Sequence, residues 1–225
     1  MNPFFDFDVH IFDCDGVILD SNCFKLAAMS QALEMCVPSI KPQSLALCEN
    51  YFKENFGRSR FHHVEVFFDR FLDITHHKNK QVIRDQVLLR YALFCKEGYR
   101  KADVVSGFRE VIAKLKSHKY VVSGTEEQEL KETLDSRNLL PLFEEVFGSP
   151  AAKIDILAII KEKYLPSTKI AVIGDSLVDL DATMANGLTF FGFVPLSNTP
   201  EMLVDKCHEY GCNIINDWSK LAKIS

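Results

Sequence analysis

The sequence predicts an α/β fold built on a doubly wound parallel sheet, with a helical domain inserted after the first strand. Short apolar runs suited to buried parallel strands recur along the chain, and amphipathic helical patterns alternate with the later runs. The predicted strands are residues 9–12, 119–123, 144–147, 169–173 and 188–194. The predicted helices between them are residues 107–117, 126–138, 152–164 and 178–186.

A long stretch from about residue 21 to residue 98 interrupts this alternation. It contains long helical patterns such as KLAAMSQALEMC and no convincing strand. Breaks in the helical pattern fall at PSIKP (38–42), FGRSR (56–60) and THHKNK (75–80). We therefore expect a helical cap domain at 21–98, inserted into a Rossmann-like core formed by residues 1–20 and 99–225.

Composition narrows the class of protein. The chain has 225 residues, of which 47% are hydrophobic, so it can bury a substantial core. A net charge of -5 provides no broad attraction for nucleic acid or for an anionic membrane, and no apolar run is long enough to span a bilayer. Seven scattered cysteines without a CxxC motif favour reduced thiols. We expect a cytoplasmic protein, by default a monomer.

The residues that follow the predicted strands are the candidate site, because ligands of such sheets bind at the carboxyl ends of the strands. DCDG follows the first strand, SGT the second, GSPAAK the third and GDSLVD the fourth. Each of these segments carries groups suited to phosphate or to a cation. Together they favour phosphoryl chemistry.

Asp13 and Asp15 offer the two groups that cleavage of a phosphate monoester needs. Asp13 is the candidate nucleophile, because an aspartate can form an acyl phosphate and so divide one difficult displacement into two. Asp15 is placed to donate a proton to the leaving oxygen and later to accept one from water. Mg²⁺ bound by carboxylates would relieve the repulsion within the pair.

The other strand ends supply the remaining parts. The Ser123 hydroxyl can donate to a phosphoryl oxygen, and Gly124 permits a close approach of the backbone. Lys153 begins a predicted helix, where the helix dipole does not favour a cation, so an anion in the site explains it better. Asp175 and Asp179 are further candidate metal ligands.

DCDGV, SGT, the lysine after GSP and GDSLVD, in this order, resemble the four motifs of the haloacid dehalogenase (HAD) superfamily. The position of the insert is similar to that of the helical-cap subgroup, which includes phosphoglycolate phosphatase-like and β-phosphoglucomutase-like proteins. The resemblance implies Asp13 as nucleophile and metal ligand, and Asp15 as general acid and base whose backbone carbonyl also binds Mg²⁺. It further implies that Ser123, Gly124 and Lys153 hold the phosphoryl group. Asp175 would bind the metal directly, and Asp179 would bind it through water or orient its neighbours.

Substrate choice is expected to lie in the insert. Arg58 and Arg60 of FGRSR could hold a second anionic or hydroxylated part of the substrate, although a solvated loop explains them equally well. The histidine pairs at 62–63 and 76–77 do not favour a metal site, because adjacent residues of a helix point in different directions.

These residues predict a Mg²⁺-dependent phosphatase that acts on a small phosphorylated metabolite through an aspartyl-phosphate. Two alternatives remain open: a β-phosphoglucomutase-like isomerase, and a binding protein that has the fold without the chemistry. The residues after Ser123 read GTEEQE, which differs from the run associated with the mutases. The sequence does not specify the substrate.

Overall fold

The computed structural model describes residues 3–72, 74 and 78–223. Its centre is a sheet of parallel strands in the order β3-β2-β1-β4-β5-β6. This is the doubly wound order, in which strands are added to one side of β1 up to β3 and then to its other side from β4 onward. The strands are β1 (Val9–Phe12), β2 (His118–Glu126), β3 (Glu145–Ser149), β4 (Ile170–Gly174), β5 (Thr189–Phe193) and β6 (Asn213–Ile215). The predicted fold class is therefore confirmed.

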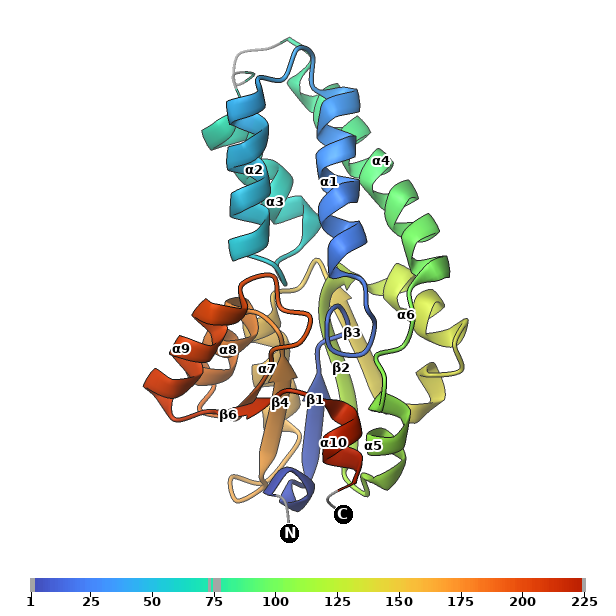
Figure 1. Ribbon diagram of the computed structural model, residues 1–225, viewed down its shortest axis with the longest axis vertical. Helices are drawn as coiled ribbons and strands as arrows, with labels where there is room; N and C mark the ends of the chain where they lie inside the picture. The colour runs from blue at the N-terminus through green and yellow to red at the C-terminus, as the bar shows by residue number, and fades with distance from the viewer. Residues whose placement is uncertain (1–2, 73, 75–77, 224–225) are drawn as a thin grey trace.

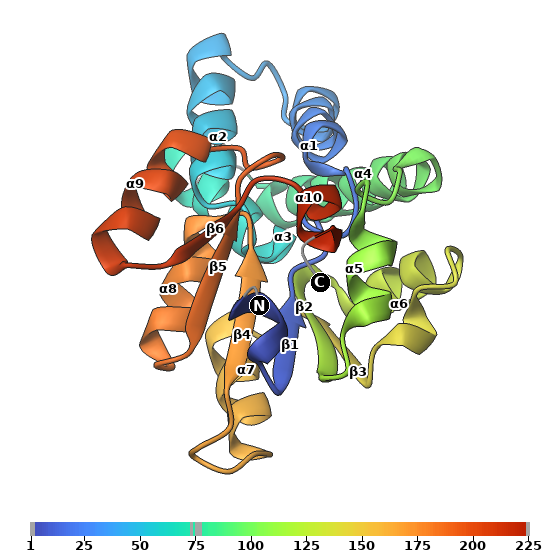
Figure 2. The ribbon, with the colours of Figure 1, turned by 60° about the horizontal axis from the view of Figure 1, so that its bottom comes forward.

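Helices cover both faces of this sheet (Figure 2). The side chains of β1 alternate between two apolar layers, because successive residues of a strand point to opposite faces. Phe12 meets Phe108 and Trp218 on one face, whereas Ile11 belongs to the cluster on the other face. The first face carries α5 (Phe108–Lys114), α6 (Glu127–Asp135) and α10 (Trp218–Ala222), and the second carries α7 (Lys153–Glu162), α8 (Leu177–Ala185) and α9 (Pro200–Tyr210).

Most of the chain between β1 and β2, from the first residue of α1 to the end of α4, forms a separate helical layer beyond the carboxyl ends of the strands, while both termini lie at the opposite end of the molecule (Figure 1). We call this layer the insert. Its helices are α1 (Asn22–Cys36), α2 (Pro42–Glu54), α3 (Arg60–Val66), a π-helical turn (Phe67–Phe71) and α4 (Lys80–Lys101). Its core combines aliphatic side chains with several aromatic ones, among them Phe52, Phe67 and Phe68. Because α4 continues to Lys101, the predicted boundary at residue 98 falls inside this helix.

The predicted strands at 9–12, 119–123, 144–147, 169–173 and 188–194 correspond to β1 to β5. The short strand β6 and the helices α9 and α10 lie beyond the predicted elements.

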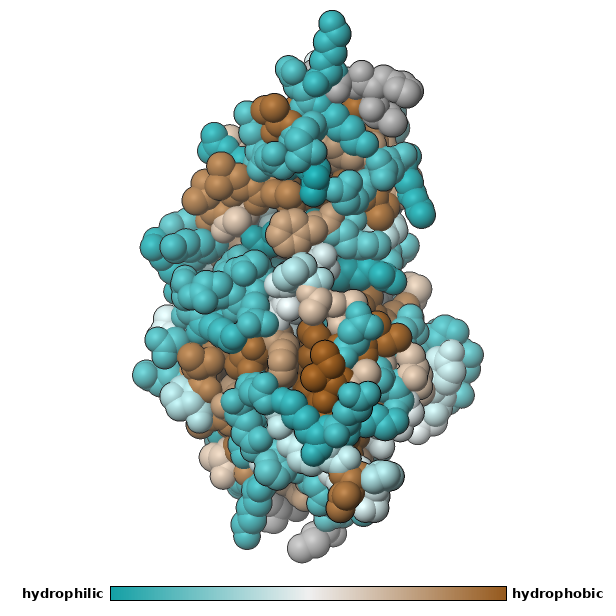
Figure 3. Space-filling view, turned by 180° about the vertical axis from the view of Figure 1, so that it is seen from behind, coloured by the Kyte–Doolittle hydropathy of each residue, from teal (hydrophilic) through white to brown (hydrophobic). Residues whose placement is uncertain are grey.

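All seven cysteines are free thiols. No helix among the described residues is long and apolar enough to cross a membrane. Hydrophobic patches over the insert and the core are separated by hydrophilic residues (Figure 3).

Candidate active site

The polar residues predicted from the strand ends meet at the carboxyl edge of the sheet. Asp13 and Asp15 directly follow β1, Asp175 follows β4, and Asp179 lies in the first turn of α8. Ser123 belongs to the carboxyl half of β2, and Lys153 begins α7 after β3. All six side chains are buried. Parallel register explains the convergence, since the strands end side by side.

Three of the carboxylates form a buried cluster. Asp13, Asp175 and Asp179 each place one oxygen within 4.8 Å of the others. Lys153 is their cation: its Nζ lies 3.0 Å from Asp13 Oδ1 and 2.5 Å from Asp179 Oδ1. Burial raises the pKa of Asp13 to about 7, although Lys153 opposes this, and Asp179 and Asp15 raise it further. One ammonium therefore does not balance the cluster.

Asp175 is the member with unused bonding capacity. Its Oδ1 is buried and has no hydrogen-bond partner among the described residues. Burial, followed by repulsion from Asp13 and Asp179, raises the pKa of Asp175 well above its usual value. Oxygen donors whose mutual repulsion one ammonium does not balance, including one unpartnered buried atom, fit a hard divalent ion such as Mg²⁺. The donor set thus fits the metal that the motifs imply.

Residues that sequence reasoning missed hold Asp175 in place. Asn22, the first residue of α1, donates through Nδ2 to Asp175 Oδ2 at 2.6 Å and to the carbonyl of Leu196 at 2.7 Å. Gly16 has a φ of +75°, and a Cβ there would lie 2.3 Å from Asp175 Oδ2. Only glycine combines that conformation with so close an approach. The metal-ligand candidate is therefore positioned by both the insert and the loop after β1.

Asp15 lies at the centre of a second network, which joins the insert to the core. Lys25 Nζ of α1 and Thr125 Oγ1 of β2 contact Asp15 Oδ2 at 2.6 and 2.8 Å. Ser21 Oγ and the Tyr99 hydroxyl of α4 donate to Oδ1 at 2.6 and 2.7 Å. Burial alone would raise the pKa of Asp15, but Lys25 and these hydrogen bonds lower it to about 2. Asp15 is ionised in this arrangement.

Ser123 lies at the edge of the same network. Its Oγ is 3.4 Å from Asp15 Oδ2 and accepts a hydrogen bond from the backbone N–H of Thr125 at 3.2 Å. The sequence pattern SGT contains Thr125, to which we assigned no role. The contact from the Thr125 hydroxyl to Asp15 Oδ2, at 2.8 Å, is shorter than the contact from the Ser123 hydroxyl.

The FGRSR loop of the insert covers this site. A Cβ at Gly124 would lie 2.4 Å from the carbonyl oxygen of Gly57, and a Cβ at Gly57 would lie 2.9 Å from Ser176 Oγ. The close approach of backbone that we expected Gly124 to permit is made here by the backbone of the insert loop. The loop backbone packs directly against the phosphoryl-binding candidates.

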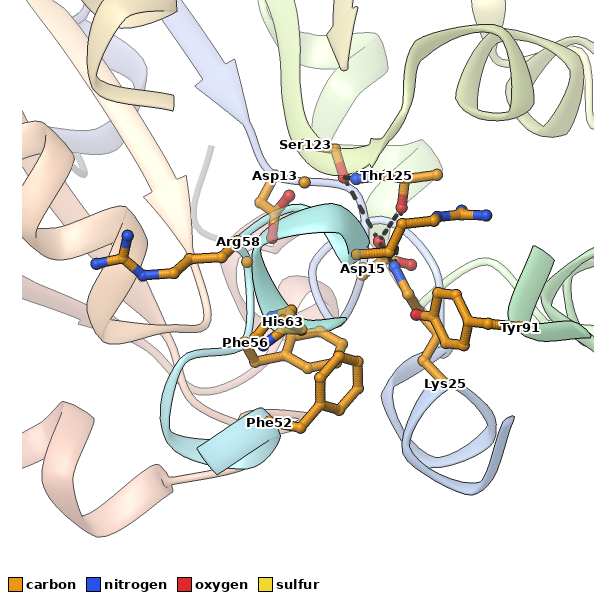
Figure 4. Close-up of a pocket in the computed structure, with 13 residues that line it drawn as sticks. Asp13, Asp15, Lys25, Phe52, Phe56, Arg58, His63, Tyr91, Ser123 and Thr125 are labelled. Atoms are coloured by element: carbon orange, nitrogen blue, oxygen red, sulfur yellow. Dashed lines mark hydrogen bonds and ion pairs between the residues drawn. The ribbon is translucent and has the colours of Figure 1, made fainter. Parts of the chain in front are cut away.

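The two arginines of this loop are placed differently. The Arg60 guanidinium is buried, with Nη2 2.5 Å from Glu129 Oε2 of α6 and its centre 4.9 Å from the Tyr91 ring centroid. Arg58 is exposed, and its guanidinium points away from Asp15 and Lys25 (Figure 4). Arg60 thus faces the pocket while paired with Glu129, whereas Arg58 lies at the rim of the pocket with its guanidinium directed outward.

The enclosed space is small. A cavity of about 10 Å³ remains between the insert and the strand ends, barely enough for one water molecule. An open groove of about 490 Å³, bordered by Arg58, Ile154 and Asp181, reaches Lys153 from outside. A phosphorylated compound therefore needs the insert to move before it can reach Asp13. His62 and His63 lie in α3, whereas His76 and His77 lie outside the described residues.

Comparisons with known proteins agree with this geometry. A sequence model of the haloacid dehalogenase-like hydrolases matches residues 7–187. A structure named as a predicted phosphatase from Clostridium acetobutylicum aligns with a TM-score of 0.72 and 17% identity, covering 96% of this chain and 97% of that chain. One named as a predicted phosphoglycolate phosphatase from Haemophilus somnus aligns with a TM-score of 0.70 and 17% identity, covering 97% of each.

A magnesium-bound structure, YfnB of Bacillus subtilis, is named as a HAD-hydrolase and aligns with a TM-score of 0.59 and 19% identity, covering 84% of this chain and 89% of that chain. At these identities the solved structures demonstrate a shared fold. No curated protein matches the sequence. The family model, however, matches most of the chain, and the four motifs that predict it meet at one site. The chain belongs to the haloacid dehalogenase-like hydrolase family and is an enzyme of that family.

Proposed function

We propose that the protein is a Mg²⁺-dependent phosphatase that hydrolyses a small phosphorylated metabolite through an aspartyl-phosphate on Asp13. The observation that carries this proposal is the position of Asp13, which shares Lys153 with Asp179, belongs to the acidic cluster and lies two residues from Asp15. Nucleophile, charge-neutralising groups and a proton-transfer group are thus next to one another, as phosphoryl transfer requires.

Hydrolysis would proceed in two displacements. The Asp13 carboxylate attacks phosphorus, the bond from phosphorus to the leaving oxygen breaks, and Asp15 gives that oxygen a proton. Water then attacks the phosphorus of the aspartyl-phosphate, Asp15 takes a proton from the water, and Asp13 is released with inorganic phosphate. Lys153 and Ser123 would hold the phosphoryl oxygens. Gly124, which has no side chain, would let the backbone of β2 approach the phosphoryl group closely.

The ion pair between Asp15 and Lys25 affects the first displacement, in which Asp15 donates a proton. With Lys25 Nζ 2.6 Å from its Oδ2, Asp15 is an acceptor of protons. Donation to the leaving oxygen requires the Lys25 contact to lengthen when substrate enters. Because Lys25 belongs to α1, the same movement of the insert that admits substrate would loosen it.

Mg²⁺ would be held by Asp13 and Asp175, by Asp179 directly or through water, and by the backbone carbonyl of Asp15. The bound ion would supply positive charge for the phosphoryl oxygens. The chain's own contribution is to keep the carboxylates together, with Asn22 fixing Asp175 and Ser176 Oγ donating to Asp179 Oδ2 at 2.5 Å. Residues 21–98 would act as a cap that closes over the substrate, and Arg58 and Arg60 would border its leaving group.

A phosphate-release screen tests this function. Purified protein is incubated with a panel of phosphorylated metabolites and with acetyl phosphate, in Mg²⁺ and in EDTA, with products examined for isomerised sugar phosphate. We expect phosphate release in Mg²⁺ and its loss in EDTA. Isomerisation without release would instead support the mutase, and no reaction with any compound, in protein that remains folded, would contradict the proposal.

A further inference from the structure

The cations that the insert directs into the pocket already have carboxylate partners. Lys25 is paired with Asp15 at 2.6 Å, and Arg60 with Glu129 at 2.5 Å. The side chains of Lys25, Asp15 and Arg60 are less than a tenth exposed, and that of Glu129 is 17% exposed. The pocket therefore contains positive groups but offers no surplus of positive charge beside the leaving group.

This pairing determines which substituents the pocket accepts. A carboxylate or second phosphate on the substrate would have to take Lys25 from Asp15, or Arg60 from Glu129. The displaced carboxylate would then be buried without a partner, which is strongly unfavourable. Arg58 does not replace them, since its guanidinium points away from the pocket (Figure 4). An uncharged substituent competes for neither cation, so Arg60 can pair with Glu129 again when the insert closes, and Lys25 with Asp15 once Asp15 has given up its proton.

His63 is the polar group of the pocket wall with unmet bonding capacity. The residue is only 1% exposed, and neither ring nitrogen has a partner at hydrogen-bond geometry among the described residues, although the backbone of Arg58 lies near enough to raise its pKa slightly. Burial lowers its pKa well below the usual value, and His62 and Lys25 lower it further, so the ring is neutral. A neutral imidazole presents one donor and one acceptor. A buried ring without partners is costly, and a ligand hydroxyl would satisfy it.

The rest of the wall is aromatic. The Phe52 ring centroid lies 4.4 Å from that of His63 and 5.6 Å from that of Phe56, and Tyr91 closes the far side. Figure 4 places His63 beside both phenylalanines. Flat apolar rings next to one hydrogen-bonding group suit a leaving group with C–H faces and hydroxyls.

We propose, on the basis of the phosphatase function proposed above, that the leaving group is an uncharged polyol or sugar and that His63 is the specificity-determining residue that hydrogen-bonds one of its hydroxyls. This distinguishes the chain from an enzyme for phosphoglycolate, whose leaving group carries a carboxylate. The insert and α6 thus select substrate by keeping their own charges paired.

Matched substrates test the charge preference. 2-Hydroxyethyl phosphate and phosphoglycolate differ in a hydroxymethyl group against a carboxylate, as do glycerol 3-phosphate and 3-phosphoglycerate. In each pair we expect kcat/KM to be at least about tenfold higher for the compound whose leaving group is uncharged. Preference for the carboxylates would refute this inference alone. No turnover of any compound, acetyl phosphate included, would refute the phosphatase function and this inference with it.

Variants at residue 63 test the role of the ring. His63→Phe keeps a flat ring and removes both nitrogens, so kcat/KM for 2-hydroxyethyl phosphate should fall about tenfold more than that for acetyl phosphate. His63→Gln restores a donor and an acceptor and should recover part of the loss. His62→Phe, at the half-exposed neighbour, is the matched control and should leave the ratio unchanged. Equal losses for both substrates in His63→Phe would show a structural role only.

A gain of function tests the pairing. Glu129→Gln removes the carboxylate that balances Arg60, so kcat/KM for phosphoglycolate relative to 2-hydroxyethyl phosphate should rise about tenfold. Glu132→Gln, at an exposed position of the same helix α6, is the control. An unchanged ratio in a Glu129→Gln protein that melts cooperatively would overturn the argument that paired charges set the preference.

Discussion

Asp175→Asn separates the stability of the acidic cluster from its function. The carboxamide has nearly the same shape, and its oxygen can still accept from Asn22. At a separation of 4.8 Å, two carboxylates repel by about 3.5 kcal/mol at an effective dielectric constant of 20. Asp175 has two such neighbours, Asp13 and Asp179, while Lys153 offsets part of the repulsion and proton uptake relieves more of it. We therefore expect the metal-free variant to be more stable by about 1 to 3 kcal/mol.

Thermal unfolding in EDTA and in Mg²⁺ measures both consequences. For a chain of this size the expected gain corresponds to a rise in Tm of roughly 5 °C in EDTA. Wild type should gain further stability with Mg²⁺, by about 2.7 kcal/mol at a hundredfold excess over Kd, whereas the variant should gain none. Asp181→Asn, an exposed position on α8, is the control. A variant that is less stable in EDTA, or that still responds to Mg²⁺, would refute the reasoning.

Three further perturbations test the residues around the cluster. Asn22→Ala removes the donor to Asp175, so Mg²⁺ affinity measured by calorimetry should fall about tenfold, and an unchanged affinity would contradict that role. Lys25→Met leaves Asp15 buried without its cation and should lower the free energy of unfolding in urea by about 3 kcal/mol; a loss below about 1 kcal/mol would speak against it. Burial lowers the pKa of His10 from 6.5 to about 4, so the unfolded chain binds more protons in that window and stability falls as the pH decreases. Between pH 7.5 and 5, wild type should lose about 2 kcal/mol more than His10→Gln, and parallel losses would exclude this linkage.

The parts of the site that could be predicted from the sequence are those fixed by strand ends. Asp13 follows a four-residue apolar strand whose bounds agree with β1, and Asp175 follows another at β4. In a parallel sheet the carboxyl ends of neighbouring strands lie side by side. Residues that follow different strands are therefore close in space, even where they are far apart in the sequence. β6 lacked such a signal, because Asn213–Ile215 is too short to show periodicity.

The contributions of the insert could not be predicted in the same way. Asn22, Lys25 and Tyr99 reach the strand ends through the packing of α1 and α4, and helical periodicity indicates a buried stripe but not the partner it meets. One signal was present: Lys25 falls in the stripe with Met29 and Leu33, where a buried lysine requires a carboxylate. His63 had no comparable signal, since its isolation depends on the surrounding aromatic rings.

The most direct test of the central claim is to look for the phosphoryl group on Asp13 itself. Protein mixed rapidly with acetyl phosphate and Mg²⁺ is quenched in acid and measured by intact mass, followed by peptide mapping. We predict a fraction of wild-type chains that carries one phosphoryl group on Asp13, and none in Asp13→Asn, which should also release no phosphate. Undiminished phosphate release by folded Asp13→Asn, or a phosphoryl group on another residue, would contradict the account.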